Sequence, residues 1–381
     1  MQEGRWKEGG GYVLLRSVES NTGVGTVIMA CSTEGARHRH TRSIIRYDDE
    51  YLCALVQVIS LIISDVVGND LGFISSGPAV RDFTTPQQCL DLLDTFGVTA
   101  AAPPSVVQLL CDEASLPEFT KDSVGHGVNN NLDQVVQKNE PSFSCENAQN
   151  VIIGSNVIAL QAAERMARDA GYGAFVLSSE VVGDAEMVGE TFARLADYIC
   201  RSLRCGRGTD QALVLAELEL VRREISKPTI TALRREIEES AHIGRPICVL
   251  AAGETTVQVR GSGTGGRCQQ MALSAAIHMH RLMAEGSDLE HDFGVAFLTA
   301  GTDGQDGPTD AAGALADPGL IGRAARSGID AETFLRENDA YTFFSQVDKG
   351  RNLLKTGLTG TNVMDVHILL VAQCQTGTGT L

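Results

Sequence analysis

Three aspartates near residue 300 stand on a turn that could bind a metal ion. Asp303, Asp306 and Asp310 follow the apolar run 294–299 and alternate with glycines in AGTDGQDGPTDAAGA. Three carboxylates this close repel one another unless a cation or hydrogen-bond donors share the site. We therefore interpret the turn as a divalent-cation site, although Asp and Gly are also ordinary residues of a solvated turn.

A second glycine-rich stretch, earlier in the chain, could hold an anion. A strand-like run at 255–259 is followed by glycines, then by Arg267, then by a helix-like segment at 269–283. Glycines let the backbone approach a bulky anion, and amides at the start of a helix would point at it. The charged, planar guanidinium of Arg267 suits a phosphate or a carboxylate. Because both stretches follow predicted strands, where open α/β sheets bind ligands, they predict a polyanion and divalent-cation site.

Small and polar residues also follow other strand-like runs. The run from Leu55 to Val67 is rich in Val and Ile, which is typical of a strand buried on both faces of a parallel sheet. Ser64 and Asp65 fall at its carboxyl end, where Asp65 could equally cap a turn or a helix. The other residues with a comparable placement are Ser76, Gly77, Asn156, Glu180 and Asp184.

The elements that must position these residues are those of an α/β fold. Strand, helix and strand alternate over 151–178, which predicts a parallel sheet with a right-handed crossover. Pro86 opens an amphipathic helix, and 366–372 reads as a last buried strand. We expect an unmatched segment at 1–54, a Rossmann-like, incomplete parallel-sheet domain at 55–243, and a smaller C-terminal α/β domain at 244–381.

Composition narrows the classes of protein. The 381 residues are enough for two domains, and a net charge of -17 argues against a nucleic acid or an anionic membrane as the main partner. Ten scattered cysteines without a C-x-x-C pair indicate reduced thiols in an intracellular protein. No apolar run is long enough to span a bilayer, and the N-terminus carries no apolar leader. We expect a cytoplasmic location, with a mitochondrial one left open.

Five ordered segments resemble the glycerate kinases that form 2-phosphoglycerate. They read SDVVGNDLGFISSGPAV, NVIIGSNVIAL, GYGAFVLSSEVVGDA, AGETTVQVRGSGTGGR and LTAGTDGQDGPTDAAGA. The last two resemble that family's C-terminal multi-organism glycine-rich domain. The resemblance extends from about Leu55 to Cys374, most of the chain.

The resemblance implies that ATP phosphorylates D-glycerate, with Mg²⁺, in a cleft between two α/β domains. Arg267 would neutralise a phosphate or the glycerate carboxylate. Asp303 or Asp306 would bind Mg²⁺ or accept the hydroxyl proton, and the sequence does not choose between these roles. Asp184 is a third candidate metal ligand. The candidate ATP-binding residues are Ser64, Asp65, Ser76, Gly77, Asn156, Glu254, Thr255, Gly261, Gly263, Gly265 and Gly266. The expected partners are D-glycerate and ATP, with no nucleic acid and no membrane, and a homodimer is left open.

The chain also departs from the family it resembles. Residues 1–54 match none of its segments, and an upstream lysine expected to act on the transferred phosphate has no counterpart. Losing such a cation would weaken transition-state stabilisation. Smaller departures fall at Asn69, Ala79, Cys268 and Gln270. One alternative is therefore a truncated, inactive kinase with a binding or regulatory role.

A reductase of hydroxypyruvate is a weaker alternative. Gly261, Gly263 and Gly266 have the G-x-G-x-x-G spacing of a dinucleotide-binding loop. The run before them alternates with polar residues, and no ribose-binding acid follows at the required distance.

Overall fold

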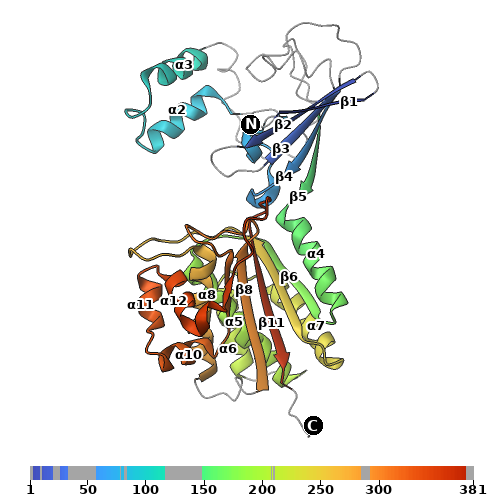
Figure 1. The fold of residues 1–381 in the computed structure, drawn as a ribbon, viewed down its shortest axis with the longest axis vertical. Coiled ribbons are helices and arrows are strands. Elements are labelled where there is room, and N and C mark those ends of the chain that lie inside the picture. The colour runs from blue at the N-terminus through green and yellow to red at the C-terminus, as the bar shows by residue number, and fades with distance from the viewer. Residues whose placement is uncertain are drawn as a thin grey trace.

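The computed structural model describes residues 3–8, 11–19, 26–32, 57–77, 79–80, 84–115, 148–206, 208, 211–284 and 292–374. They form two β-sheets with associated helices (Figure 1), which confirms the predicted α/β class.

The first sheet has the strand order β1-β2-β3-β4-β5. Its strands are β1 (Glu3–Glu8), β2 (Gly11–Glu19), β3 (Thr26–Ser32), β4 (Gln57–Ile63) and β5 (Ala148–Gly154). Neighbours are antiparallel except β4 and β5, which are parallel. The stretch 1–54, which matched nothing in the resemblance, therefore contributes three strands to this sheet.

Short helices follow β4. They are η1 (Val67–Asn69), η2 (Ile74–Ser76), α2 (Pro86–Thr95) and α3 (Pro104–Ala114). Helix α2 starts where Pro86 predicted, because Thr85 and Gln88 form a capping box. Strand β4 is not buried on both faces as predicted, since Ile59 is exposed whereas Ser60 is buried.

The second sheet has the order β10-β9-β8-β11-β7-β6. Its strands are β6 (Gly173–Val181), β7 (Ile247–Gly253), β8 (Phe293–Gly301), β9 (Gly313–Ala316), β10 (Leu353–Leu354) and β11 (Asp365–Gln373). Only β6 and β7 run parallel, and the other pairs are antiparallel. The last strand, β11, thus lies in the middle of the sheet.

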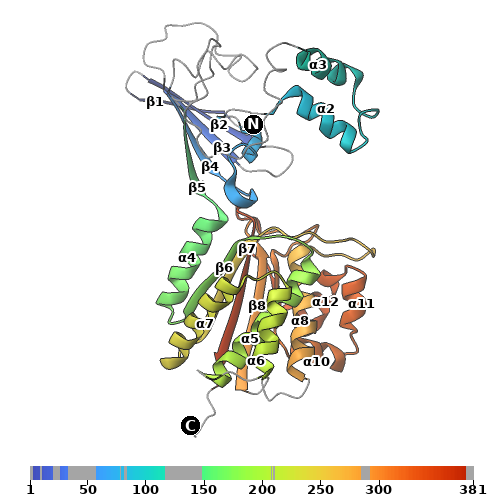
Figure 2. The same cartoon turned by 180° about the vertical axis from the view of Figure 1, so that it is seen from behind.

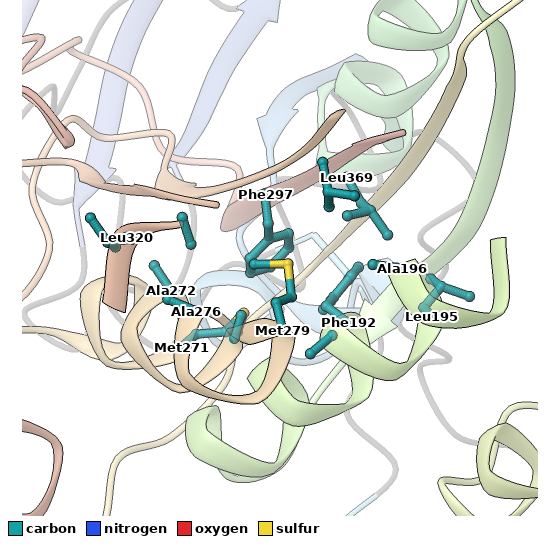
Figure 3. Close-up of a cluster of buried hydrophobic side chains, with 14 of the residues drawn as sticks. Phe192, Leu195, Ala196, Met271, Ala272, Ala276, Met279, Phe297, Leu320 and Leu369 are labelled. Atoms are coloured by element: carbon teal, nitrogen blue, oxygen red, sulfur yellow. The ribbon is translucent and has the colours of Figure 1, made fainter. Parts of the chain in front are cut away.

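Helices cover both faces of the second sheet (Figure 2). They are α4 (Asn156–Asp169), α5 (Ala185–Cys205), α6 (Gln211–Arg222), α7 (Lys227–His242), α8 (Arg267–Ala284), α10 (Leu320–Arg326), α11 (Ala331–Arg336), α12 (Ala340–Gln346) and the 3₁₀ turn η4 (Val347–Gly350). Leu160 of α4 packs on Leu250 of β7, while α5 and α8 pack on the other face. Figure 3 shows that second contact, where the rings of Phe192 and Phe297 stack at 4.6 Å.

Two sequence predictions about these elements were wrong. The pair β5 and β6, predicted as one βαβ unit, is divided between the two sheets, and the parallel pair is instead β6 and β7, joined through α5–α7. The run 255–259 is not a strand, because only Thr256 forms an isolated bridge, to Asp184. The second sheet also takes in β6, which precedes the boundary predicted at 243/244. Local patterns reveal strands, but not which sheet each strand joins.

Candidate active site

The carboxyl ends of strands from both sheets meet between the sheets (Figure 1). Strand β4 ends at Ile63, just before Ser64, and η1 after it packs against β6, with Glu180 about 3.9 Å from a Cβ added at Gly68. In the second sheet, Asp365 begins β11 opposite Gly253 and Gly301, the last residues of β7 and β8. This register brings the residues that follow β7 and β8 to either side of Asp365.

Arg267 is held by two carboxylates. Its Nε and Nη2 donate to Asp365 at 2.6 and 2.9 Å, and its Nη1 lies 2.9 Å from Glu254. The Asp365 side chain is fully buried, whereas the Glu254 side chain is partly exposed. Burial opposes the charge of Arg267, but the bonds to Asp365 raise the guanidinium pKa. Arg267 therefore orients and neutralises protein carboxylates, besides any role toward a ligand.

Asp306 caps helix α8. Its Oδ1 accepts from the Cys268 amide at 3.1 Å and its Oδ2 from the Gln269 amide at 2.8 Å. The helix N-terminus that was predicted to bind an anion is thus occupied by the protein's own carboxylate. Burial raises the pKa of Asp306 to about 6, although the two amides oppose the shift. This arrangement explains Asp306 as a cap rather than as the predicted metal ligand or base.

The glycine loop 261–266 packs against the turn between α11 and α12. The Gly261 amide donates to Asn338 Oδ1, the Gly263 amide to the Glu337 carbonyl, and the Thr264 amide to Asp339 Oδ1. A Cβ added at Gly261 would lie 2.3 Å from the Glu337 carbonyl oxygen. These glycines allow backbone to pack against backbone, and their predicted role in binding an anion stays a prediction.

The neighbouring glycines of this loop contact other parts of the site. Gly265 has only ordinary contacts, whereas a Cβ at Gly266 would collide with the Asp306 carboxyl group. Protein atoms thus lie against Gly261, Gly263 and Gly266, the three glycines that have the G-x-G-x-x-G spacing. These contacts remove the support for a dinucleotide site there.

Asp303 lies next to the Arg267–Asp365 pair and is partly exposed. A Cβ added at Gly301 would lie 2.9 Å from Asp303 Oδ1 and 3.5 Å from Asp365 Oδ1. Asp303 Oδ1 accepts from the Gln305 amide at 3.0 Å, which fixes the carboxylate in a tight turn. Unlike Asp306, this carboxylate is accessible to a ligand.

The first sheet contributes Ser64 and Asp65. Ser64 is buried, and its Oγ accepts from the Val66 amide at 3.2 Å. Asp65 Oδ2 accepts from the Asn362 amide group at 3.1 Å, which links the two sheets. The nearby Gly77 adopts a left-handed conformation, and the side chain of Ser76 lies outside the described residues.

Three more predicted residues, Asn156, Thr255 and Asp184, are buried or bonded within the protein. Asn156 is buried at the start of α4 and donates to the Ser179 carbonyl at 2.5 Å. Thr255 is also buried, next to Glu254. Asp184 caps α5 by accepting from the amides of Glu186 and Met187 at 2.9 and 3.2 Å. Asp184 also forms an isolated bridge with Thr256, and among the described residues Asp184, Asp303 and Asp306 do not form a three-carboxylate group that could hold a metal ion.

Among the residues that the structure describes, no cluster of three or more His, Cys, Asp or Glu side chains could hold a metal ion alone. Mg²⁺ does not require such a cage, because proteins commonly bind it through one or two carboxylates together with substrate phosphates and water. Asp303 is the accessible carboxylate that fits this mode.

A buried polar cluster lies behind the Arg267–Asp365 pair. His367, fully buried in β11, bonds through Nδ1 to Thr299 Oγ1 at 2.8 Å. Cys268 is buried as well, and burial raises its thiol pKa, which keeps it neutral. This cluster supports the site from within the sheet.

Sequence reasoning missed Asp365 and did not assign a role to Asn362. Asp365 directly precedes the strand predicted at 366–372 and opens the observed strand β11, and Asn362 lies in the small polar turn before it. A polar residue at the start of an apolar strand was the available signal, but only the register of β11 places it between β7 and β8.

None of the described helices combines enough length with enough apolar character to cross a bilayer.

Comparisons with known proteins find similar sequences and a similar fold. The model of the MOFRL family matches residues 247–365, and that of a domain of unknown function (DUF4147) matches residues 51–111. The chain is 41% identical over 317 residues to a glycerate kinase of Macaca fascicularis, which covers 83% of this chain and 72% of that protein. It is 29% identical over 318 residues to a glycerate 2-kinase of Pyrococcus horikoshii, covering 82% and 56%.

A solved structure is also similar. The crystal structure of a glycerate kinase from Thermotoga maritima has a TM-score of 0.53 and 28% identity, covering 82% of this chain and 57% of that chain. The chain thus spans little more than half the length of this protein and of the Pyrococcus relative.

Proposed function

Because the chain belongs to the glycerate kinase family, we propose that it phosphorylates D-glycerate with ATP and releases 2-phosphoglycerate. The name of the Pyrococcus relative supports phosphorylation of the 2-hydroxyl group. The chain spans only part of the length of several relatives, so the activity must be tested on the 381-residue chain itself.

One observation carries the proposal: polar residues from the strand ends of both sheets meet, and Asn362 bonds Asp65 across the junction. Phosphoryl transfer mainly requires a protein to position two substrates and to neutralise the negative charge of the phosphates. Loops at strand ends can do both, because their side chains are placed by rigid strands.

We assign the metal role to Asp303 within this proposal. It is accessible and fixed by its turn, whereas both oxygens of Asp306 bond to helix amides. Mg²⁺, when bound, would neutralise charge on the phosphates of ATP. Arg267, held by Asp365 and by the more exposed Glu254, would use the N–H groups that these two carboxylates leave to neutralise a phosphate or the glycerate carboxylate.

An assay of the purified chain with D-glycerate, ATP and Mg²⁺ tests the proposal, with ³¹P NMR to identify the product. A phosphate on carbon 2 couples to one proton and a phosphate on carbon 3 to two. We expect 2-phosphoglycerate. Absence of turnover from a cooperatively folded chain would contradict the proposal and favour a binding or regulatory role.

Asp303→Asn should lower kcat about 100-fold or more, because it removes a positioned anionic group, and should leave the melting temperature unchanged. Asp306→Asn is the matched control. It puts an amide NH₂ against the amides that start α8, so it should lower the melting temperature. Equal losses of stability in both variants would show that Asp303 is structural. Arg267→Ala is a poor probe, since it would leave Asp365 buried without its cation.

A further inference from the structure

The loop before β11 is held in a strained conformation. Met364 is almost fully buried and has a backbone φ of 71°, a value that residues other than glycine rarely adopt. Thr302 fixes this loop: its amide and its Oγ1 both donate to the Met364 carbonyl, at 3.1 and 2.7 Å, and its Oγ1 accepts from the Val363 amide at 2.9 Å. A bulky residue persists in this region only when its surroundings impose it, and such strain concentrates at functional sites.

The strained loop fixes the orientation of the Asn362 amide. Asn362 Oδ1 accepts from the Met364 amide at 3.0 Å, so Nδ2 must point the other way. There it donates to Asp65 Oδ2 at 3.1 Å. Asp65 follows β4 of the first sheet and is 297 residues away in the sequence, so this bond joins the two sheets. Its acceptor is a carboxylate, which makes the bond stronger than one between neutral groups.

The same loop also holds Asp303. The Thr359 amide donates to the Asp303 carbonyl at 3.0 Å, and Thr359 Oγ1 donates to the Thr302 carbonyl at 2.6 Å. Segments 302–303 and 359–364 therefore move as one unit. Any displacement of Asn362 from Asp65 separates Asp65 from Asp303.

We propose that Asn362 is a positioning residue, which docks Asp65 onto the loop that carries Asp303 and so brings the two halves of the site into register. The catalytic part of this inference rests on the proposed function. When the Asn362–Asp65 bond opens, the site is incomplete, and the apparent affinity for substrates falls in proportion to the fraction of molecules that remain docked.

The first test is Asn362→Asp, read by hydrogen exchange. An aspartate keeps the acceptor for the Met364 amide and the shape of the side chain, but sets a second carboxylate against Asp65. Exchange should speed up about tenfold or more in peptides covering both 64–70 and 359–364. Asn352→Asp is the matched control: Asn352 donates to the Leu315 carbonyl, within the second sheet, so its replacement should leave exchange in 64–70 unchanged.

A rescue variant separates positioning from a general loss of structure. Asp65→Asn combined with Asn362→Asp lets the new asparagine donate to the new aspartate, while that aspartate still accepts from the Met364 amide. Slow exchange in both segments should return. The proposal is overturned if the double variant exchanges as fast as Asn362→Asp, or if Asn362→Asp affects 359–364 and not 64–70.

Kinetics provide a second readout. Asn362→Asp should raise the KM values for ATP and D-glycerate about tenfold, with a smaller change in kcat, because saturating substrate restores docking. The exchange experiment needs no turnover, so it decides the docking role even if the chain is not a kinase. Kinase activity without exchange coupling would refute only the role of Asn362.

Discussion

Arg267 and His367 are basic side chains of one polar cluster, but only Arg267 is charged at physiological pH. Both lose solvation, but Arg267 donates two hydrogen bonds to the buried Asp365 carboxylate, and its guanidinium stays charged. His367 bonds instead to a hydroxyl group, on Thr299. Burial lowers the pKa of His367 to about 4; Asp365 opposes this shift and Arg267 adds to it. His367 is therefore neutral at physiological pH.

This shift predicts a pH dependence of stability. The folded pKa of His367, about 4, lies below the ordinary value of 6.5, so between these values the unfolded chain binds more protons. The contribution is fully present above pH 6.5 and is lost as the pH falls through 4, to a total of about 3 kcal/mol. His367→Asn keeps a partner for Thr299 but cannot titrate. Its unfolding free energy, measured by denaturant at pH 7.5 to 4, should fall less steeply than that of the wild type.

Asp306 acts in the same range with the opposite sign. Its folded pKa, about 6, lies above the ordinary value of 3.8, so its contribution is lost as the pH rises through 6. The wild type and His367→Asn both carry Asp306. The difference between their curves of unfolding free energy against pH therefore reports the titration of His367 alone. Parallel curves would show that His367 does not titrate in this way.

At the scale of elements, α5 and α8 approach each other closely at Gly189. A Cβ added there would lie 2.4 Å from the Met271 carbonyl oxygen, which is backbone and cannot turn aside. This approach fixes α8, which begins at Arg267 and whose first amides donate hydrogen bonds to Asp306. A small residue at position 189 thus helps to place the site.

Gly189→Ala should destabilise the fold by about 1–3 kcal/mol, because the helices must separate. The matched control is Gly322→Ala in α10, where a Cβ would meet nothing closer than 3.8 Å. That variant should be neutral or more stable by up to about 1 kcal/mol, since alanine favours helix. Thermal melts of both variants check this, and similar losses in the two would mean that the close contact is not the cause.

At the scale of the whole molecule, the described hydrophobic core is concentrated in the second sheet and its helices. Both larger clusters consist of residues after Ser155, whereas the first sheet contributes a small cluster around Ile62 and Ile74. We therefore propose a domain boundary at Ser155, which caps α4. The predicted compartment and the homodimer stay predictions.

A fragment of residues 155–381 should fold on its own. It retains the clusters on both faces of the second sheet, so we expect a single sharp melt within about 5 °C of the main transition of the whole chain. A fragment that starts at Gly173 is the control, because without Leu160 the α4-facing surface of β7 is uncovered, and it should melt lower. A broad melt from the first fragment would contradict the proposed boundary.

Sequence patterns and the resemblance they carry predicted the family, the α/β class, most elements and the polar residues at the strand ends. Helix α2, helix α8, and strands β8 and β11 were predicted near their observed bounds, because apolar runs, proline and glycine act locally. Tertiary structure decided which partner each polar group has. Asp306 bonds to amides about 38 residues away, Gly261 to a side chain 77 away, and Arg267 to Asp365, 98 away. No local pattern encodes such pairings, since they depend on strand order and register, which the whole core sets.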